Sequence, residues 1–396
     1  MIPRRWVPVS PGEWEDVEKR LESSSVPEEA INEWEAAIAS YTAMPHAAAV
    51  SSGRQGMLCI LEHLGIGPND EVIVPAYTLG ELLPLIQGLG ATPVPVDVTT
   101  DTFNVTADAI APRITTRTRA ILVLHAFGAP ADMPPILALA GSRHIPVIED
   151  CAHSLGATLN GRQAGSFGYA GFFSFEPTKP VNTFGGGMVV TRDEALARHV
   201  RERQRAGRAA SDFLLAKLKT VRTEQRMFQT RAAYVPLTLL AFPVIRSLMK
   251  RLYRRVQPAP PQTLRYLPLQ AEMGLRTLPM LQERLDRRNA LAAAYRAALR
   301  PEIRTQTLSA GARSTWYFYV VQLPRRVRWP RLQLLIKGID AGIESEIADD
   351  CAALLGQRDC PNAASLYVSA MALPMYDHMT PAQVQRVASA INDAVS

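Results

Sequence analysis

Short apolar runs alternate with helix-length stretches along the first half of this chain, and this alternation constrains its fold most. The runs are rich in valine and isoleucine and occupy 71–76, 92–98, 119–128 and 145–151. Strands that are separated by helices pair in parallel, and continuous apolar runs are typical of strands buried on both faces. Residues 168–177 and 185–191 are two further predicted strands. We therefore expect an α/β fold with three layers, in which helices cover a mostly parallel sheet.

Two short helices are predicted before this alternation, and the last third of the chain predicts a second, smaller domain. Residues 13–40 have the spacing of two short helices, and 269–300 are helical in pattern. A strand is predicted at 316–323 and a closing helix from about Pro381. A length of 396 residues suits two or three domains. We expect a large domain at 1–262 and a smaller α/β domain at 263–396.

Residues 205–262 break the alternation and carry the chain's basic character. From Arg208 to Arg255 there are eleven lysines and arginines against two acids, a balance of +9, so the remainder carries 6 − 9 = −3. An apolar core at 232–245 lies inside this segment. Any argument about partners depends on this segment rather than on net charge. We expect no nucleic-acid partner.

The four cysteines are far apart, and no C-x-x-C pair occurs. This spacing excludes a cysteine zinc site and a disulfide framework, and we expect no metal. The first twenty residues contain no apolar run of the kind found in secretion signals, which favours a cytoplasmic protein.

Two features stand where such sheets bind ligands, beyond the carboxyl ends of strands. The turn at 51–53 leads from a strand into a helix, where backbone N–H groups favour a phosphate, although such a turn is more often only a helix cap. Asp150 closes a buried strand, and a buried carboxylate needs a cation. Either a protonated cofactor nitrogen or a nearby arginine would serve.

Two further features follow along the chain. Lys179 is the only lysine between Lys19 and Lys217. A desolvated amine suits Schiff-base chemistry, whereas a solvated surface lysine has no such role. The glycines at 185–187 allow close approach to a ligand or form a plain tight turn. Together the four features match the needs of pyridoxal phosphate: an anchored phosphate, a protonated ring nitrogen and an amine that binds the aldehyde.

The sequence also resembles the DegT/StrS-type sugar aminotransferases, pyridoxal-phosphate enzymes of the aspartate-aminotransferase fold (fold type I). The resemblance covers nearly all of the chain except about 205–262. The stretches that carry it include HAAAVSSG, LGIGPNDEVIVPAYT, GATPVPVDV, TRAILVLHAFGAPADM, IPVIEDCAHSLGA, GSFGYAGFFSFEPTK and GGGMVVT.

This resemblance implies a role for each matching residue. Lys179 is similar to the lysine that binds the cofactor and moves the substrate proton. Asp150 matches the partner of the ring nitrogen, and His153 the residue that hydrogen-bonds the ring hydroxyl. The phosphate-binding positions are Gly53, Arg54, Gln55 and Ser174.

Several positions depart from the family pattern. Arg54 replaces a usual threonine, Gln55 a small residue, and Gly185 a common glutamate. Leu79 stands where an aromatic ring often stacks on the cofactor. Thr263 replaces an asparagine that reaches the phosphate of the neighbouring subunit, while Arg265 retains a nearby arginine. These changes face the ligand, so the substrate is expected to be atypical.

The resemblance implies a homodimeric enzyme that transfers an amino group from an amino acid, glutamate in the first instance, to a nucleotide-linked keto-deoxyhexose. A dehydratase is disfavoured because Lys179 is retained, and a non-catalytic scaffold because Lys179, Asp150 and Ser174 are all present. Residues 232–245 are too short to span a bilayer, which takes about 20 residues. With basic residues on both sides, they suit either peripheral membrane contact, and then a lipid-linked acceptor, or a lid or subunit interface.

Overall fold

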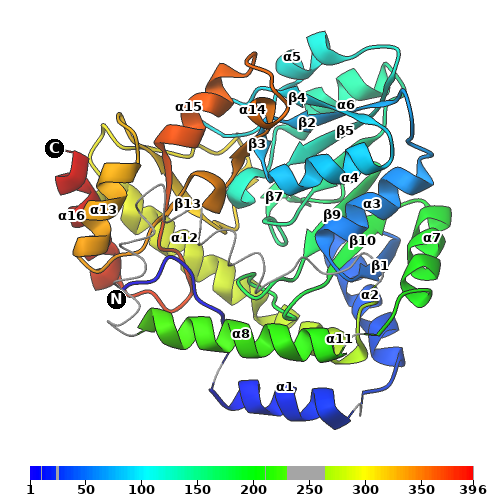
Figure 1. Cartoon of the computed structure of the whole chain (residues 1–396), viewed down its shortest axis with the longest axis horizontal. Helices are drawn as coiled ribbons and strands as arrows, with labels where there is room; N and C mark the ends of the chain where they lie inside the picture. Colours follow the sequence, from blue (N-terminus) through cyan, green and yellow to red (C-terminus); the bar gives the residue numbers. More distant parts are fainter. Residues whose placement is uncertain (10, 24–25, 210, 230–263, 396) are drawn as a thin grey trace.

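The expected parallel sheet lies at the centre of the larger part of the molecule (Figure 1). The computed structural model describes the chain except residues 10, 24–25, 210, 230–263 and 396. Seven strands form the sheet in the order β1-β10-β9-β6-β5-β2-β4. All run in one direction except β10, which is antiparallel to both neighbours. The strands are β1 (His46–Val50), β2 (Glu71–Pro75), β4 (Thr92–Val96), β5 (Thr118–Leu124), β6 (Val147–Asp150), β9 (Ala170–Ser174) and β10 (Gly187–Thr191).

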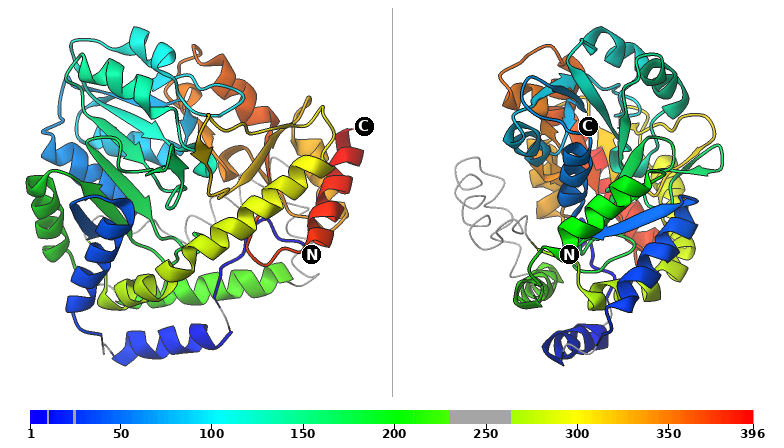
Figure 2. Two further views of the ribbon diagram at one scale, coloured as in Figure 1. Left: turned by 180° about the vertical axis from the view of Figure 1, so that it is seen from behind. Right: turned by 90° about the vertical axis from the view of Figure 1, so that its right-hand side faces the viewer.

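Helices cover both faces of this sheet because its central strands are apolar on both sides (Figures 1 and 2). In β2, Val72 and Val74 face one helical layer and Ile73 faces the other, as the two-residue period of a strand requires. The first layer contains α3 (Gly53–His63), α4 (Leu83–Gly88) and α7 (Glu194–Arg205). The second contains α2 (Glu29–Thr42), α5 (Ala107–Ile110), α6 (Met133–Gly141) and α11 (Pro268–Thr277). The predicted three-layer α/β fold is confirmed.

A second, four-stranded sheet forms a separate core near the C-terminus. Its strands pair antiparallel in the order β11-β13-β16-β14. They are β11 (Arg304–Thr305), β13 (Tyr319–Gln322), β16 (Ala370–Leu373) and β14 (Gly342–Ile343). The helices packed there are α12 (Leu281–Ala298), α13 (Arg328–Ile336) and α16 (Pro381–Val395). A smaller α/β unit is therefore present, as expected.

The two units are interleaved along the chain. Ile2 belongs to the core of the small unit, whereas α11 packs against α2 on the large sheet. Short strands join the units where β3 (Tyr77–Thr78) pairs with β15 (Asp349–Asp350), close to α14 (Cys351–Leu354) and α15 (Pro361–Ser369). A small third sheet is formed by β7 (Thr158–Leu159), β8 (Arg162–Gln163) and β12 (Ala312–Arg313). The boundary at 262/263 stays a prediction.

The helical stretch predicted at 269–300 is interrupted. A 3-10 turn at Leu278–Met280 separates α11 from α12. Pro279 lies inside this turn, and proline cannot donate the backbone hydrogen bond that a continuous helix needs. The proline therefore allows the two helices to take different directions.

The described part of the basic segment is largely helical. After α7, helix α8 (Ser211–Gln229) packs against α1 (Pro11–Ser23) through a shared apolar cluster. The apolar run at 232–245 lies outside the described residues. Among the helices that are described, none is long and apolar enough to cross a membrane.

Candidate active site

A pocket of about 340 Å³ lies where the large sheet, the small unit and α8 meet. The carboxyl ends of β6 and β9 and the start of α3 form one side, as expected for a sheet of this topology. Residues 3–7, helix α8 and the loop before β13 form the other side. The predicted residues that line it are Gly53, Arg54, Leu79, Asp150, His153, Ser174 and Lys179.

Lys179 is buried beside the pocket, with 7% of its surface exposed. The solvated-surface alternative is therefore wrong. Its Nζ lies 3.8 Å from the ring centroid of Tyr317, a cation–π geometry. Burial lowers the pKa of the Lys179 amine, although Tyr317 and Asp150 oppose the shift. A larger neutral fraction makes this amine a better nucleophile and base than an exposed lysine.

Hydrogen bonds hold the loop that carries Lys179 in place. Its ends are joined by backbone hydrogen bonds from Phe175 to Gly186 and from Thr183 to Phe175. Gln270 on α11 donates to the Thr183 carbonyl at 3.1 Å. The loop is therefore fixed by these hydrogen bonds, and the position of Lys179 is fixed with it.

Asp150 ends β6 and is 4% exposed. Its Oδ1 accepts a hydrogen bond from the Ala152 amide at 2.9 Å, and no ion pair with an arginine joins it among the described residues. Burial raises its pKa to about 6, against the lowering effects of the Ala152 amide and the Lys179 ammonium. A buried carboxylate in this state is poised to accept a protonated ligand nitrogen.

His153 lies in a stack of rings at the pocket. Its ring centroid is 4.3 Å from that of Tyr317 and 6.3 Å from that of Phe127, with nearly parallel planes. Burial, reinforced by the Lys179 ammonium, holds the pKa of His153 well below its usual range, so the ring is neutral near pH 7. Its Nδ1 is buried and has no hydrogen-bond partner in the part of the chain that the structure describes. A ligand hydroxyl would satisfy this nitrogen.

The start of α3 lines the same pocket as Lys179. Ser52 caps the helix, because its Oγ accepts the Gln55 amide at 3.2 Å. The cap alternative is thus confirmed, and Gly53 also lines the pocket with Ser174 from the end of β9. Free amides of a first helical turn attract anions, so a phosphate can bind here as well.

Two residues predicted to bind the phosphate make other contacts. The Arg54 guanidinium forms an ion pair with Glu81 at the pocket. The Gln55 side chain points into the protein, where Nε2 lies 3.5 Å from Cys59 Sγ. The side chain of Gln55 therefore does not face this end of the helix, and its backbone amide already donates to Ser52.

The remaining predicted residues lie at or beyond the rim. Leu79 lines the pocket and is 39% exposed. Arg265 lies away from the pocket and pairs with Glu28 at 3.1 Å. Thr263 is outside the described residues. The reach of Thr263 and Arg265 into a neighbouring subunit stays a prediction.

The glycines at 185–187 do not line this pocket among the described residues. Gly186 has a φ of 89°, and a Cβ there would lie 2.1 Å from the Tyr266 ring. The tight-turn alternative accounts for this residue, because a side chain would collide with Tyr266.

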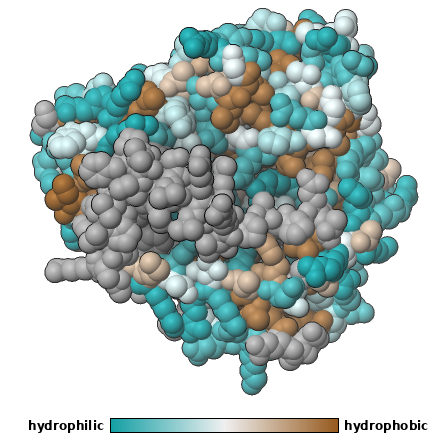
Figure 3. Space-filling model, viewed as in Figure 1, coloured by the Kyte–Doolittle hydropathy of each residue, from teal (hydrophilic) through white to brown (hydrophobic). Residues whose placement is uncertain are grey.

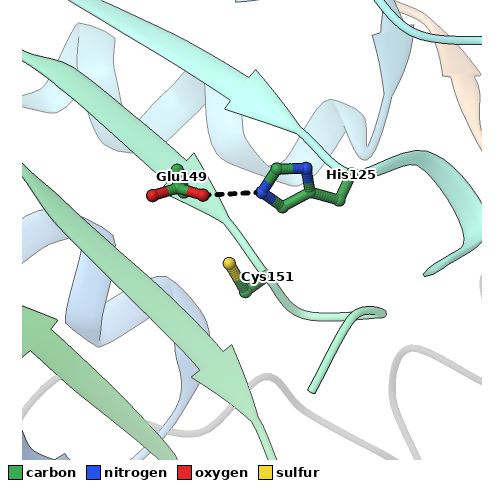
Figure 4. Close-up of side chains that lie close together, drawn as sticks. All are labelled: His125, Glu149 and Cys151. Atoms are coloured by element: carbon green, nitrogen blue, oxygen red, sulfur yellow. Dashed lines mark hydrogen bonds and ion pairs between the residues drawn. The ribbon is translucent and has the colours of Figure 1, made fainter. Parts of the chain in front are cut away.

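His125, Glu149 and Cys151 form a buried cluster (Figure 4), and two of them are the sequence neighbours of Asp150. Glu149 accepts hydrogen bonds from His125 and from the amides of Gly165, Phe167 and Gly168. The Ala131 amide donates to His125 Nδ1, so the ring is neutral and Nε2 donates to Glu149. The potential ligand atoms of His125 and Glu149 are thus already hydrogen-bonded, and these bonds stabilise the end of β6.

Sequence reasoning did not identify Tyr317 as part of the site. Its hydroxyl lies 2.8 Å from Thr178 Oγ1, next to Lys179. Burial would raise the pKa of Tyr317, but the Lys179 ammonium, the contact with Thr178 and the charge of Arg5 together lower it. The one signal was four consecutive aromatic residues, 316–319, which are more than a one-sided strand needs. Arg5 and Lys217 also line the pocket and carried no motif.

Comparisons with known proteins find similarity along nearly the whole chain. The sequence profile of the DegT/DnrJ/EryC1/StrS aminotransferase family matches residues 12–392. GDP-perosamine synthase of Caulobacter vibrioides is 31% identical over 375 residues, which cover 92% of this chain and 90% of that enzyme.

Two further proteins are similar. UDP-N-acetyl-3-dehydro-alpha-D-glucosamine 3-aminotransferase of Acidithiobacillus ferrooxidans is 45% identical over 168 residues, which are 42% of this chain and 46% of that enzyme. The match thus spans less than half of that relative. DesV of S. venezuelae, solved in complex with a ketimine intermediate, is 27% identical with a TM-score of 0.76, covering 97% of this chain and 95% of that one.

Proposed function

The chain belongs to the DegT/DnrJ/EryC1/StrS aminotransferase family and is therefore a pyridoxal-phosphate-dependent aminotransferase, and we propose that it aminates a nucleotide-linked keto sugar. Glutamate is the proposed amino donor and a keto-deoxyhexose the proposed acceptor. The observation that carries the proposal is the buried amine of Lys179 in a pocket that also holds the buried Asp150 carboxylate.

The residues present fit the cofactor. Asp150 is a buried carboxylate with a pKa of about 6 and one amide donor, so a ring-nitrogen cation would stabilise its ionised form. His153 Nδ1 is a buried nitrogen without a partner among the described residues, which a ring hydroxyl would satisfy. The capped start of α3 and Ser174 form a cradle for the phosphate.

When bound, pyridoxal phosphate supplies an electron sink for the negative charge left on a substrate carbon after deprotonation. Lys179 takes up the proton at Nζ and returns it, because its lowered pKa leaves part of the amine neutral. Asp150 holds a proton on the ring nitrogen, and the neutral His153 ring orients the ring hydroxyl. Ser174 and the first turn of α3 hold the phosphate in place.

The names of the relatives support a sugar acceptor. GDP-perosamine synthase and UDP-N-acetyl-3-dehydro-alpha-D-glucosamine 3-aminotransferase both name sugars or sugar derivatives linked to nucleotides. The buried Lys179 disfavours a dehydratase and a non-catalytic scaffold.

One spectroscopic experiment tests this function. Glutamate added to the holoenzyme should convert the visible absorbance of the cofactor to that of its aminated form. A nucleotide-linked keto sugar should then restore the original spectrum. A holoenzyme that does not respond to any amino acid would contradict the proposal.

A homodimer with shared active sites is also proposed. Exposed hydrophobic residues near the pocket rim support it, since Leu79 is 39% and Leu354 61% exposed. Figure 3 shows hydrophobic surface among largely hydrophilic surroundings on this side of the molecule. Mixed dimers of Lys179→Ala and Arg265→Ala subunits should regain one complete site if Arg265 acts across the interface. A fully active monomer in sedimentation would contradict the dimer.

A peripheral membrane contact through 205–262, on the cytoplasmic side, is a second proposal. The flanking basic charges support it, and a lipid-linked or otherwise atypical keto sugar would then be the alternative acceptor. Helix α8 supports the lid alternative, because Arg222 pairs with Glu15 and Lys219 with Glu18 on α1. In flotation with anionic liposomes at low salt, wild type should float and a 232–255 deletion that binds cofactor should not. Equal behaviour would favour the lid.

A further inference from the structure

The first residues of the chain form part of the pocket wall. The Ile2 amide donates to the Gly338 carbonyl at 2.8 Å, and the Asp340 amide donates to Ile2 at 2.9 Å. The Val7 amide donates to Gln225 Oε1 on α8 at 3.1 Å. This N-terminal arm, residues 2–7, is therefore fixed at both ends, between the small unit and α8.

The residues on either side of Arg5 are anchored to the small unit. Arg4 lies 2.9 Å from Glu346 and 3.5 Å from Asp340 in an ion-pair network that includes the buried Arg331. Trp6 stacks on Tyr376 with ring centroids 6.0 Å apart. Because both neighbours are held, the backbone presents Arg5 at the pocket, where it is a lining residue.

Arg5 differs from the other basic residues of the pocket. Arg54 is paired with Glu81, and Lys217 with Glu176 at 2.6 Å. Lys179 lies on the ring of Tyr317. Within the described chain, Arg5 alone among these four forms no ion pair, no side-chain hydrogen bond and no cation–π contact.

No acidic side chain at the pocket forms an ion pair with Arg5 among the described residues. Glu81 and Glu176 are engaged by the two cations just described, and Glu346 by Arg4 and Arg331. The charge of Arg5 nevertheless acts inside the site. Burial raises the pKa of Tyr317, whereas Lys179, Thr178 and Arg5 lower it, and the net result is a lowered pKa. An unpaired guanidinium near the reacting lysine suits a negatively charged group of a ligand.

We infer that Arg5 binds an oxyanion of a substrate, either a carboxylate of the amino donor or the diphosphate of the acceptor. A guanidinium offers a planar fork of N–H donors that matches either group in a bidentate manner. Both substrates of the proposed function carry such a group, so this inference rests on that function. Arg5 would then determine specificity for one of them, while Lys179 and Asp150 perform the chemistry.

Calorimetric binding of two unreactive probes to the holoenzyme tests this inference. Glutarate represents the carboxylates of glutamate, and inorganic pyrophosphate represents the diphosphate of the acceptor. The variants are Arg5→Gln, Arg5→Lys and the control Arg326→Gln, which removes an exposed arginine outside the pocket. We expect Arg5→Gln to weaken one probe about tenfold or more, since a charge-assisted hydrogen bond is lost. Arg5→Lys should restore part of the affinity, and Arg326→Gln should match wild type.

The outcomes separate the two sources. Weaker glutarate binding alone assigns Arg5 to the donor, and weaker pyrophosphate binding alone assigns it to the acceptor. Unchanged binding of both probes by Arg5→Gln, or no binding of either probe to wild type, would overturn the inference. A wild-type holoenzyme whose absorbance does not respond to glutamate or another amino acid counts instead against the proposed function, whatever the two probes show.

Discussion

Two walls of one pocket differ in how the chain builds them. The strand-end wall comprises Ser52, Gly53, Asp150, Ser174 and Lys179, at or just beyond the ends of sheet strands. The assembled wall comprises the N-terminal arm, helix α8 and Tyr317, which come from three distant parts of the sequence. Residues of the first wall are positioned by the sheet itself, whereas those of the second are positioned by contacts between units.

The difference suggests that the strand-end wall and the assembled wall have different roles in the reaction. A sheet holds its strand ends rigidly, which suits groups that must stay within hydrogen-bonding distance of a cofactor. Packing between units can change without disturbing the sheet, which suits groups that distinguish substrates. Variants of the strand-end wall should therefore impair the reaction itself, and variants of the assembled wall should mainly affect substrate affinity.

The largest effect is expected at Lys179. Lys179→Ala removes the buried amine and should lower kcat by about three orders of magnitude or more, because both covalent binding and proton transfer are lost. Borohydride should reduce the cofactor onto wild-type protein but not onto this variant. Lys217→Ala removes the other lysine that lines the pocket, and borohydride should still reduce the cofactor onto this variant. A covalent adduct on Lys179→Ala would show that the assignment is wrong.

Asp150→Asn should lower kcat about a hundredfold, because the ring nitrogen loses its anionic partner. In the cofactor-free protein, where there is no ring nitrogen to pair with, the same substitution should instead stabilise the folded state above about pH 6. Asp150 is protonated in folded and unfolded states below about pH 4, whereas above about pH 6 its buried charge destabilises the folded state by about 3 kcal/mol.

Cofactor-free wild type should therefore lose stability between about pH 4 and pH 6 relative to Asp150→Asn, and the gap should stay constant above pH 6. Urea unfolding of both proteins across this range measures it. If the difference in unfolding free energy between the two proteins were equally large at pH 4, its cause would be packing rather than the charge of the carboxylate.

A smaller effect is expected at Tyr317 on the assembled wall. Tyr317→Leu removes the ring that contacts the Lys179 ammonium, so the pKa of the lysine should fall further. Because Lys179 and His153 also lose the ring that they contact, we expect about a tenfold loss of kcat/KM, together with a shift in the pH dependence of cofactor absorbance. Tyr317→Phe keeps the ring and should retain most of the activity. Equal losses of kcat/KM in Tyr317→Leu and Tyr317→Phe would show that the hydroxyl and its contact with Thr178, rather than the ring, are what the reaction needs.

The smallest effect is expected at Gln225, which joins α8 to the N-terminal arm. Gln225→Ala removes the hydrogen bond to the Val7 amide, worth about 1 kcal/mol, and should raise the KM of one substrate a fewfold while kcat is unchanged. Gln282→Ala removes a hydrogen bond on α12 outside the pocket and is a matched control. A fall in kcat without a change in KM would mean that the assembled wall also takes part in the reaction.

Much of the fold could be predicted because the periodicity of a buried strand is local. The predicted runs at 71–76 and 145–151 correspond to β2 and β6, and the strand predicted at 316–323 contains β13. The predicted helix at 269–300 was wrong only at Pro279, where the helix divides in two. Proline acts on its own turn of the backbone, but whether the chain bends there depends on packing.

The sequence by itself determined the three-layer fold and the family, because short local patterns repeat along the chain. It also determined the positions of Lys179 and Asp150 along the chain, because each is tied to the end of one strand. Only the tertiary structure decided that Lys179 is buried against Tyr317, that Gln55 faces the interior and that Arg5 lies at the pocket without an ion pair among the described residues. These facts depend on contacts between residues more than a hundred positions apart or on which face of a helix packs inward. Such contacts arise from the complete packing of both units, and no local pattern records them.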